Sequence, residues 1–441
     1  MAEMAEIARE EAGRDHGLVR AIGVFGFAAA ITNEVVGSGV YRIPGGMAAA
    51  AGTMAPYAYL ACLVAMGAIV LCFAEAGSRV PTSGGPYGYV EAAFGPMLGF
   101  IAGMLVWLSS VLACGGIAAA VADTIGVMVP ALTGIVPHSL LIFAVLGAMA
   151  WINLLGVDLA ARVIGLATLV KLLPLLFFLV VGGIALATGS HAAAPVTNTP
   201  DVGVGIGRAA TLAIFALSGM ETPLAASGEV TNPSRNVPRA LLLAMGSIGL
   251  LYIAIQLIAD GLLGAGLIGS KTPLADALGT LDVRLRAPLL FGAFLSMLFW
   301  LGSDLLGAPR VLFAFARDGL LPAPLGRLHP KWRTPYWAIL LHAGLASLLA
   351  LSGTYEALAV LSAQAIAPLY ALVCAAAIVL QRRGVAILGK PLSLPLLPVA
   401  ALVGIVSMGA LLAVAEPAEI GAVAGVVVGS ALLFLVMRKR R

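Results

Sequence analysis

Apolar residues run along this 441-residue chain in blocks of membrane-spanning length, separated by short stretches that hold charges, glycines and prolines. A helix needs about 20 predominantly apolar residues to cross a bilayer. Cutting the sequence at its charges and turn residues gives twelve spans: 21–46, 54–78, 97–128, 138–156, 160–188, 204–228, 239–264, 288–316, 335–352, 355–381, 392–414 and 418–437. The pattern predicts an all-α integral membrane protein with twelve transmembrane helices.

The composition agrees with this prediction. Hydrophobic residues make up 61% of the chain and charged residues 10%, with a mean hydropathy of +1.04, whereas soluble domains carry about 25% charged residues. No stretch remains for a sizeable soluble domain, so the net charge of +4 does not indicate a nucleic-acid partner. We expect the lipid bilayer to be the main surrounding of the protein, and no nucleic acid.

The charged residues between the spans predict the orientation. Residues 1–20 carry more acids than bases, which is atypical of a signal peptide, so we interpret them as an uncleaved cytoplasmic tail. With that end inside, the inner loops collect most of the arginines and lysines, while the outer loops hold only Lys271, Arg284 and Arg286. This asymmetry predicts a multi-pass protein of the cell (inner) membrane with both termini in the cytoplasm, ending in a basic tail at 438–441.

The first ten spans form two sets of five, at residues 21–188 and 203–381, followed by the last two spans at 392–437. The first span of each set is interrupted by small residues, Gly37-Ser38-Gly39 in one and Ser218-Gly219 in the other. Because five is odd, the two sets must cross the membrane in opposite senses. Interrupted segments at matching places in two inverted halves mark the midplane site of a transporter. Such a break exposes N–H groups at the start of a half-helix, whose positive dipole end can hold a carboxylate.

Four segments carry a resemblance to a known family. "GSGVYRIPG" (37–45), Glu75–Gly95, Phe215–Ala240 and Pro309–Ile339 resemble, in order, motifs of the amino acid–polyamine–organocation (APC) superfamily of amino acid permeases. The resemblance spans about residues 20–380. It implies a LeuT-type fold, a five-plus-five inverted repeat with two further helices, in which helices 1 and 6 unwind at mid-membrane. It also implies transport of amino acids or related amines.

The resemblance further implies where a substrate would bind. Its carboxylate would meet backbone amides of the first break, and its ammonium would meet carbonyls of both breaks. The implied substrate-binding residues are Val36, Gly37, Ser38, Gly39, Phe215, Ala216, Ser218 and Gly219. Phe215 would also be an aromatic lid, Glu221 would help to close the cytoplasmic path, and Tyr370 is a weaker gate candidate. The alternative for the glycines is close packing between helices without a ligand site.

Lys171 is the first of three buried charges that need an explanation. It lies nine residues past Arg162, or roughly 13 Å into the membrane by helical rise. Burying it costs about 2.5–3.5 kcal/mol on insertion scales. Several members of the resembled family have a lysine here, where sodium-coupled relatives bind a sodium ion. We hypothesise that Lys171 carries a proton; the alternative is a permanently charged tether between helices 1 and 5.

Glu34 and Asp304 are the other two buried charges that need an explanation. Helical rise places them roughly 21 Å and 20 Å from the nearest charges at their span ends, Arg20 and Arg317. Two deep carboxylates favour a substrate with a cationic side chain, because an unpaired carboxylate in a low dielectric needs a partner. Two other interpretations stay open: an internal ion pair between one acid and Arg42, and proton coupling through an acid.

The remaining chemistry-bearing residues predict little. The cysteines stand singly in apolar runs and the five histidines form no metal-binding pattern, so we expect neither a metal site nor a cofactor. No catalytic cluster or phosphate loop is present, which disfavours an enzyme or a primary pump. The sequence therefore predicts a secondary active amino acid transporter, proton-coupled and favouring cationic amino acids, as a monomer or homodimer. The alternative is an amino acid or polyamine exchanger without net proton coupling.

Overall fold

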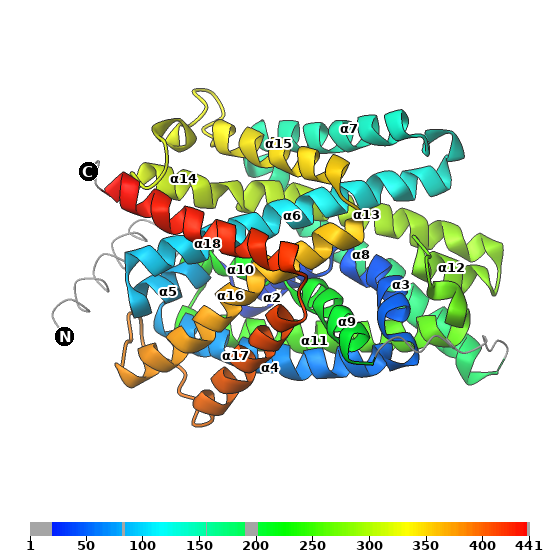
Figure 1. Ribbon diagram of the computed structural model, residues 1–441, viewed down its shortest axis with the longest axis horizontal. Coiled ribbons are helices and arrows are strands. Elements are labelled where there is room, and N and C mark those ends of the chain that lie inside the picture. The colour runs from blue at the N-terminus through cyan, green and yellow to red at the C-terminus, as the bar shows by residue number, and fades with distance from the viewer. Residues whose placement is uncertain (1–19, 82–83, 156, 190–201, 439–441) are drawn as a thin grey trace.

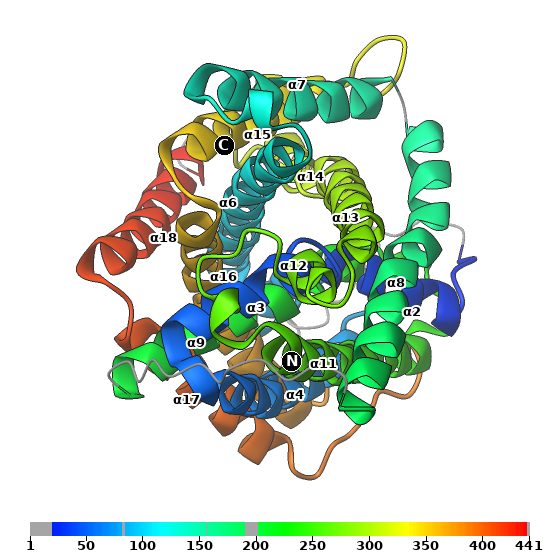
Figure 2. The same ribbon diagram turned by 90° about the vertical axis from the view of Figure 1, so that its right-hand side faces the viewer.

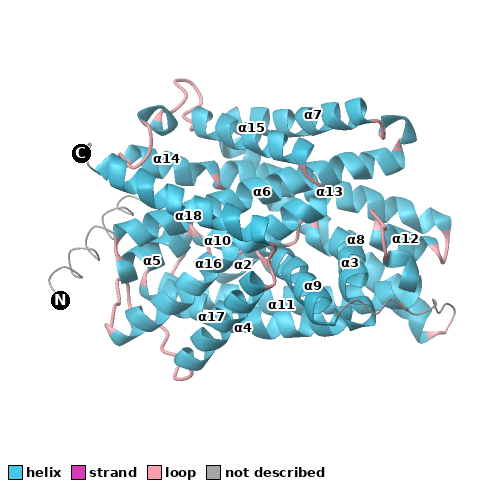
Figure 3. Cartoon of the chain, in the orientation of Figure 1, coloured by secondary structure: helices cyan, strands magenta, loops and turns pink. Residues whose placement is uncertain are grey.

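The computed structural model describes residues 20–81, 84–155, 157–189 and 202–438, and this part of the chain is helical with short connections (Figures 1 and 3). The α-helices are α2 (Val24–Val35), α3 (Gly39–Ala51), α4 (Ala55–Arg79), α5 (Pro86–Phe94), α6 (Pro96–Met128), α7 (Ile135–Leu154), α8 (Val157–Ala187), α9 (Val202–Leu217), α10 (Glu221–Leu224), α11 (Pro233–Leu263), α12 (Pro273–Gly279), α13 (Arg286–Gly307), α14 (Pro309–Arg317), α15 (Tyr336–Ser352), α16 (Tyr355–Arg382), α17 (Leu397–Ala413) and α18 (Pro417–Arg438). Nearly all of the two expected tails lies outside the described residues.

The expected spans correspond to these helices. Within the described ranges, eight helical segments are long and apolar enough to cross a membrane. Four more apolar helices are shorter: Val24–Val35, Gly205–Leu217, Tyr336–Ser352 and Leu397–Ala413. Two of these short helices, α2 and α9, each form only half of an expected span, because the helix stops at a break. The count of twelve spans stays a prediction.

Helix packing follows the inverted repeat. The first set runs from α2 to α8 and the second from α9 to α16. Each helix of one set has a counterpart in the other set, and counterparts make equivalent contacts. The contact of α6 with α16 corresponds to that of α13 with α8, and the contact of α2 with α11 corresponds to that of α9 with α4. The short helices α5 and α12 hold matching places in the two sets, and they lie at opposite ends of the bundle (Figure 1). We use these helices to name the two ends, the α5 end and the α12 end.

The two breaks lie side by side in the centre of the bundle, where α3 packs along α9 (Figure 2). A Cβ atom on Gly39 would lie 2.9 Å from Ala216 Cα, which is too close for any real side chain. Gly219 has a φ of +115°, and a Cβ there would meet the backbone oxygen of Glu34 at 3.1 Å. Glycine is therefore required at both positions, for close approach at one and for backbone conformation at the other.

The span predicted at 288–316 lies within one apolar helical segment, Val283–Arg317. The structure divides it into α13 and α14, which meet at Ala308. Pro309 has no N–H to continue the ladder, and it occupies the first position of α14, where prolines are tolerated. The division leaves Asp304 in the last turn of α13, beside the two breaks.

Candidate functional site

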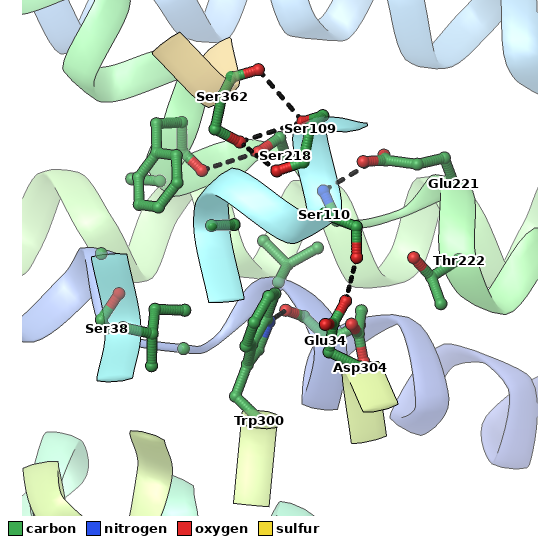
Figure 4. A pocket seen from close by; sticks show the side chains of 18 of the residues that line it. Glu34, Ser38, Ser109, Ser110, Ser218, Glu221, Thr222, Trp300, Asp304 and Ser362 are labelled. Carbon is green, nitrogen blue, oxygen red and sulfur yellow. Dashed lines mark hydrogen bonds between the residues drawn. The ribbon is translucent and has the colours of Figure 1, made fainter. Parts of the chain in front are cut away.

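A cavity lies between the two breaks and is walled by α6, α13 and α16 (Figure 4). Its lining is mostly small or hydroxylated, with three acids and two large aromatic side chains. The residues are Glu34, Val35, Gly37, Ser38, Gly39, Val106, Ser109, Ser110, Ala113, Ile117, Phe215, Ala216, Ser218, Gly219, Glu221, Thr222, Trp300, Asp304 and Ser362. The volume of the cavity is only about 40 Å³. An amino acid with a large side chain therefore needs the walls to move apart.

The carbonyl groups freed at the first break accept hydrogen bonds from side chains of three other helices. The donors are Lys171 Nζ to Asn33 O (2.8 Å), Trp300 Nε1 to Glu34 O (2.6 Å), Tyr252 Oη to Val35 O (3.1 Å), and Ser296 Oγ to Val36 O and Gly37 O (3.4 Å each). The C-terminal end of α2 is thus capped from α8, α11 and α13, and Lys171 places a cation at the negative end of its dipole.

The amide groups of the first break are arranged differently. The Gly37 N–H donates to Val35 O at 2.9 Å, so it is occupied within the break. Among the described residues no backbone acceptor is found for the amides of Ser38, Gly39 and Val40, which open α3. These three amides, rather than that of Gly37, form the free N-terminal end of a half-helix beside the cavity.

The second break satisfies its groups locally. Ser218 donates through both its backbone N–H (3.3 Å) and its hydroxyl (2.8 Å) to Phe215 O. The Gly219 N–H donates to Glu221 Oε2 at 3.1 Å, and the same carboxylate oxygen accepts from Tyr370 Oη at 2.9 Å. Glu221 and Tyr370, both proposed as gate residues from the sequence, are therefore in direct contact on the α10 side of the cavity.

Glu34 and Asp304 both line the cavity, and Figure 4 shows their side chains next to each other. Glu34 Oε2 accepts from Ser303 Oγ at 2.7 Å, while Oε1 is buried without a hydrogen-bond partner. Asp304 Oδ1 accepts from Ser110, and its Oδ2 lies 3.0 Å from His342 Nε2. Each acid thus keeps one oxygen without a hydrogen-bond partner, but that of Asp304 lies beside the His342 imidazole.

Arg42 does not neutralise either acid. Its guanidinium lies 3.1 Å from Asp123 and 3.4 Å from Glu356, so the internal pair of Glu34 with Arg42 that the sequence left open is not formed. Asp123 also binds Lys271 at 2.8 Å. This cluster stands on the α12 side of the cavity, because α3 points away from the break toward that end (Figure 1).

Tyr355 is a site residue that the sequence reasoning missed. Its hydroxyl lies 3.1 Å from Ser38 Oγ, its ring packs edge-on against Phe215 with centroids 6.1 Å apart, and Arg42 sits over the ring at 4.7 Å. Together with Phe215 it closes the cavity on the α12 side. Its position at the first residue of α16 gave no periodic or charge signal.

The two breaks differ in exposure. Val36, Ser38 and Val40 are almost fully buried, whereas Ser218, Gly219 and Thr222 are partly exposed. The second break is therefore more accessible than the first.

One group of residues could hold a metal ion. Cys114, Asp304 and His342 each offer one ligand atom, these atoms lie within 4.8 Å of one another, and all three residues are buried. They come from α6, α13 and α15. Sequence spacing could not reveal this cluster, since its members are 38 or more positions apart.

Comparison with known proteins adds three kinds of finding: a family match, two similar relatives and a similar fold. Residues 22–435 match the amino acid permease family. The branched-chain amino acid permease BcaP of Bacillus subtilis is 26% identical over 387 residues, which cover 83% of this chain and 82% of that protein. The serine/threonine exchanger SteT of Bacillus subtilis is 27% identical over 381 residues, covering 84% and 85%.

The third finding concerns the fold. The structure of MhsT in complex with L-phenylalanine superposes with a TM-score of 0.58, covering 90% of this chain and 99% of that one, at 16% sequence identity. At that identity the similarity shows the LeuT-type fold and nothing finer. The family match runs nearly end to end and the helix arrangement agrees with it. The chain belongs to the amino acid permease family of the APC superfamily, whose members are membrane transporters and not enzymes.

Proposed function

We propose that this protein is a secondary active transporter that carries amino acids, with a preference for cationic ones, by alternating access of the cavity between the two breaks. The observation that carries the proposal is the pairing of unlike groups in one cavity. Free amides of a half-helix lie at one wall and an acid with an unpartnered oxygen lies at another. A zwitterion with a cationic side chain complements both.

The carboxylate of the substrate would bind the amides of Ser38, Gly39 and Val40. They stand at the positive end of the α3 dipole, where carboxylates are favoured. The α-ammonium would bind carbonyls at the end of α9, around Ala216, because those of Phe215 and of the first break already accept hydrogen bonds within the protein. Phe215 and Tyr355 would cover the bound substrate from the α12 side.

The side chain of the substrate would point toward Glu34. An ionised carboxylate in a low-dielectric pocket is costly without a partner, and a ligand cation supplies one. The geometry favours Glu34 over Asp304 for this contact, since the Asp304 oxygen that accepts no hydrogen bond lies 3.0 Å from His342 Nε2. In this proposal Glu34 contacts the substrate cation and Asp304 supports it; the direct contact of Asp304 predicted from the sequence stays a prediction.

Lys171 is the proposed coupling residue. Its ammonium holds the last turn of α2 through Asn33 O, directly behind the break. Loss of its proton would weaken that contact and release α2, so protonation could bias one access state against the other. Exchange without net proton movement is the second candidate function, because Lys171 forms no salt bridge within the described part of the chain and its contact with Asn33 O is equally compatible with a fixed tether of α2.

Uptake by the purified protein in liposomes tests the proposal. Labelled lysine should accumulate when a proton gradient is imposed, and unlabelled lysine, arginine and ornithine should compete better than leucine or alanine. Glu34→Gln should reduce the preference for lysine over leucine by roughly 10-fold or more, since an unpaired buried group costs about 1–3 kcal/mol. Asp304→Asn should narrow it less. Better competition by leucine in the wild type would refute the cationic preference, and the absence of any amino acid uptake would refute the transport function.

A further inference from the structure

We propose that Cys114, Asp304 and His342 form a binding site for a borderline-soft divalent transition metal such as Zn²⁺, built into the wall of the cavity. The site does not depend on which substrate the cavity carries. Its three side chains come from three different helices, α6, α13 and α15, and each is 1% exposed or less. Such a convergence of thiol, carboxylate and imidazole in an apolar bundle requires a physical reason.

The first argument is the hydrogen bonding of the cluster. Among the described residues, neither imidazole nitrogen of His342 has a hydrogen-bond partner, and Asp304 Oδ2 has none either. His342 Nε2 and Asp304 Oδ2 are only 3.0 Å apart, yet their orientation does not make a hydrogen bond. Unsatisfied buried polar atoms are rare and costly. Two of these atoms point at one spot that Cys114 Sγ also reaches.

The second argument is geometry and ligand type. Zinc bonds of about 2.0–2.3 Å to nitrogen, oxygen and sulfur place neighbouring ligand atoms roughly 3.3–3.8 Å apart in a tetrahedral site. The three atoms here lie within 4.8 Å of one another, so small side-chain rotations bring them to that spacing. Thiolate and imidazole ligands select zinc and its neighbours over calcium or magnesium.

The third argument is charge. A divalent ion with one thiolate, one carboxylate and one neutral imidazole gives a site of zero net charge, which suits an apolar interior. The other oxygen of Asp304 accepts from Ser110, an outer contact of the kind that orients metal-binding carboxylates. The edge of His342 faces the ring of Trp107, with centroids 6.5 Å apart, which closes the site on that side.

Three protein ligands leave a fourth position for water or another small ligand. Asp304 lines the cavity, so the metal would sit in its wall and join α13 to α6 and α15. A metal ion there would bind the Asp304 oxygen that accepts no hydrogen bond, and would leave Glu34 as the acid available to the substrate.

Metal content and cobalt spectra of the full-length protein test the site. After purification without chelators, elemental analysis should find about one Zn²⁺ per chain in the wild type. After chelation, added Co²⁺ should give the absorption of a tetrahedral cobalt thiolate centre. Cys114→Ser and His342→Gln should each lower the bound metal at least 10-fold. Matched controls are Cys374→Ser and His138→Gln, a buried cysteine and a histidine outside the cluster, and both should retain the metal.

Equal metal content in the wild type, Cys114→Ser and His342→Gln would overturn the proposal, and so would a wild type that binds neither ion. An unfolded variant does not obscure the result, because the cobalt spectrum of the wild type alone shows or excludes thiolate ligation. Transport measured in parallel separates the two proposals. A wild type that binds neither ion but still transports amino acids refutes the metal site and leaves the proposed function intact.

Discussion

Both breaks interrupt a helix and free backbone hydrogen-bonding groups, but the protein satisfies these groups differently at the two breaks. The carbonyls of the first break receive hydrogen bonds from Lys171, Trp300, Tyr252 and Ser296, which belong to distant helices. The second break uses its own neighbours, since Ser218 caps Phe215 and Glu221 caps Gly219. Among the described residues, Tyr370 donates the side-chain hydrogen bond that ties the second break to another helix.

This difference indicates different roles. The first break is fixed by the surrounding bundle, so its amides are held ready for an anionic group without reorganisation. Fewer hydrogen bonds from distant helices hold the second break, and segments held in this way open at lower free-energy cost. Its residues are also the partly exposed ones. We infer that the first break chiefly binds the substrate, and that the second chiefly changes conformation during transport.

The largest effect is expected where the two breaks touch. Gly39→Ala should abolish measurable uptake, because the added Cβ would meet the Ala216 backbone at 2.9 Å and force the breaks apart. Overpacking of this kind costs typically 1–3 kcal/mol or more. Gly246→Ala is the matched control, since a Cβ there meets nothing within 4 Å. Wild-type uptake by Gly39→Ala would show that the breaks do not have to meet.

Lys171→Ala is expected to have the second largest effect on uptake. It removes the cation from Asn33 O, a contact of a class worth about 1.5–3 kcal/mol, and should lower uptake roughly 10-fold or more. If Lys171 is the coupling residue, the remaining uptake should no longer depend on pH. Lys271→Ala is the control, since that lysine binds Asp123 in an exposed position. An unchanged pH profile in Lys171→Ala would make Lys171 a tether or a bystander.

A third comparison sets one cap of the first break against one of the second. Ser296→Ala leaves Val36 O and Gly37 O without a hydrogen-bond donor among the described residues and should lower the free energy of unfolding by about 1–3 kcal/mol. Ser218→Ala should lower it by less than about 1 kcal/mol, because the backbone N–H of residue 218 still reaches Phe215 O. Thermal unfolding in detergent measures both. A larger loss in Ser218→Ala would reverse the assignment of the fixed and the mobile break.

The smallest effect concerns the long-range contact of the second break. Tyr370→Phe removes one hydrogen bond from Glu221, worth about 0.5–1.5 kcal/mol, which corresponds to a shift of roughly 3- to 10-fold between states. Thr222→Cys reports the shift, since residue 222 is partly exposed and the natural cysteines of the described chain are buried. Its labelling by a thiol reagent should speed up when Tyr370→Phe is added. An unchanged labelling rate would remove Tyr370 from the gate.

Sequence patterns predicted the spans, the repeat and both breaks, because apolar length and interrupting glycines are local signals. The partners of the breaks were not predictable in this way. Trp300, Tyr252 and Ser296 are ordinary residues of apolar helices, and only the fold brings them to α2, more than 200 positions away. The same holds for His342, whose neighbour Asp304 is on another helix. Arg42 shows the opposite failure, since proximity in sequence to Glu34 suggested a pair that the direction of α3 prevents.

The central claim is that the amides opening α3 bind a substrate carboxylate while Glu34 binds a side-chain cation. Competition against labelled lysine tests it directly, with lysine, cadaverine (lysine without its carboxylate) and norleucine (lysine without its side-chain ammonium) as unlabelled ligands. The account predicts that lysine competes at least 10-fold better than either analogue, since each analogue leaves one buried group unpaired. Cadaverine competing as well as lysine would contradict the carboxylate site, and norleucine competing as well would contradict the role of Glu34.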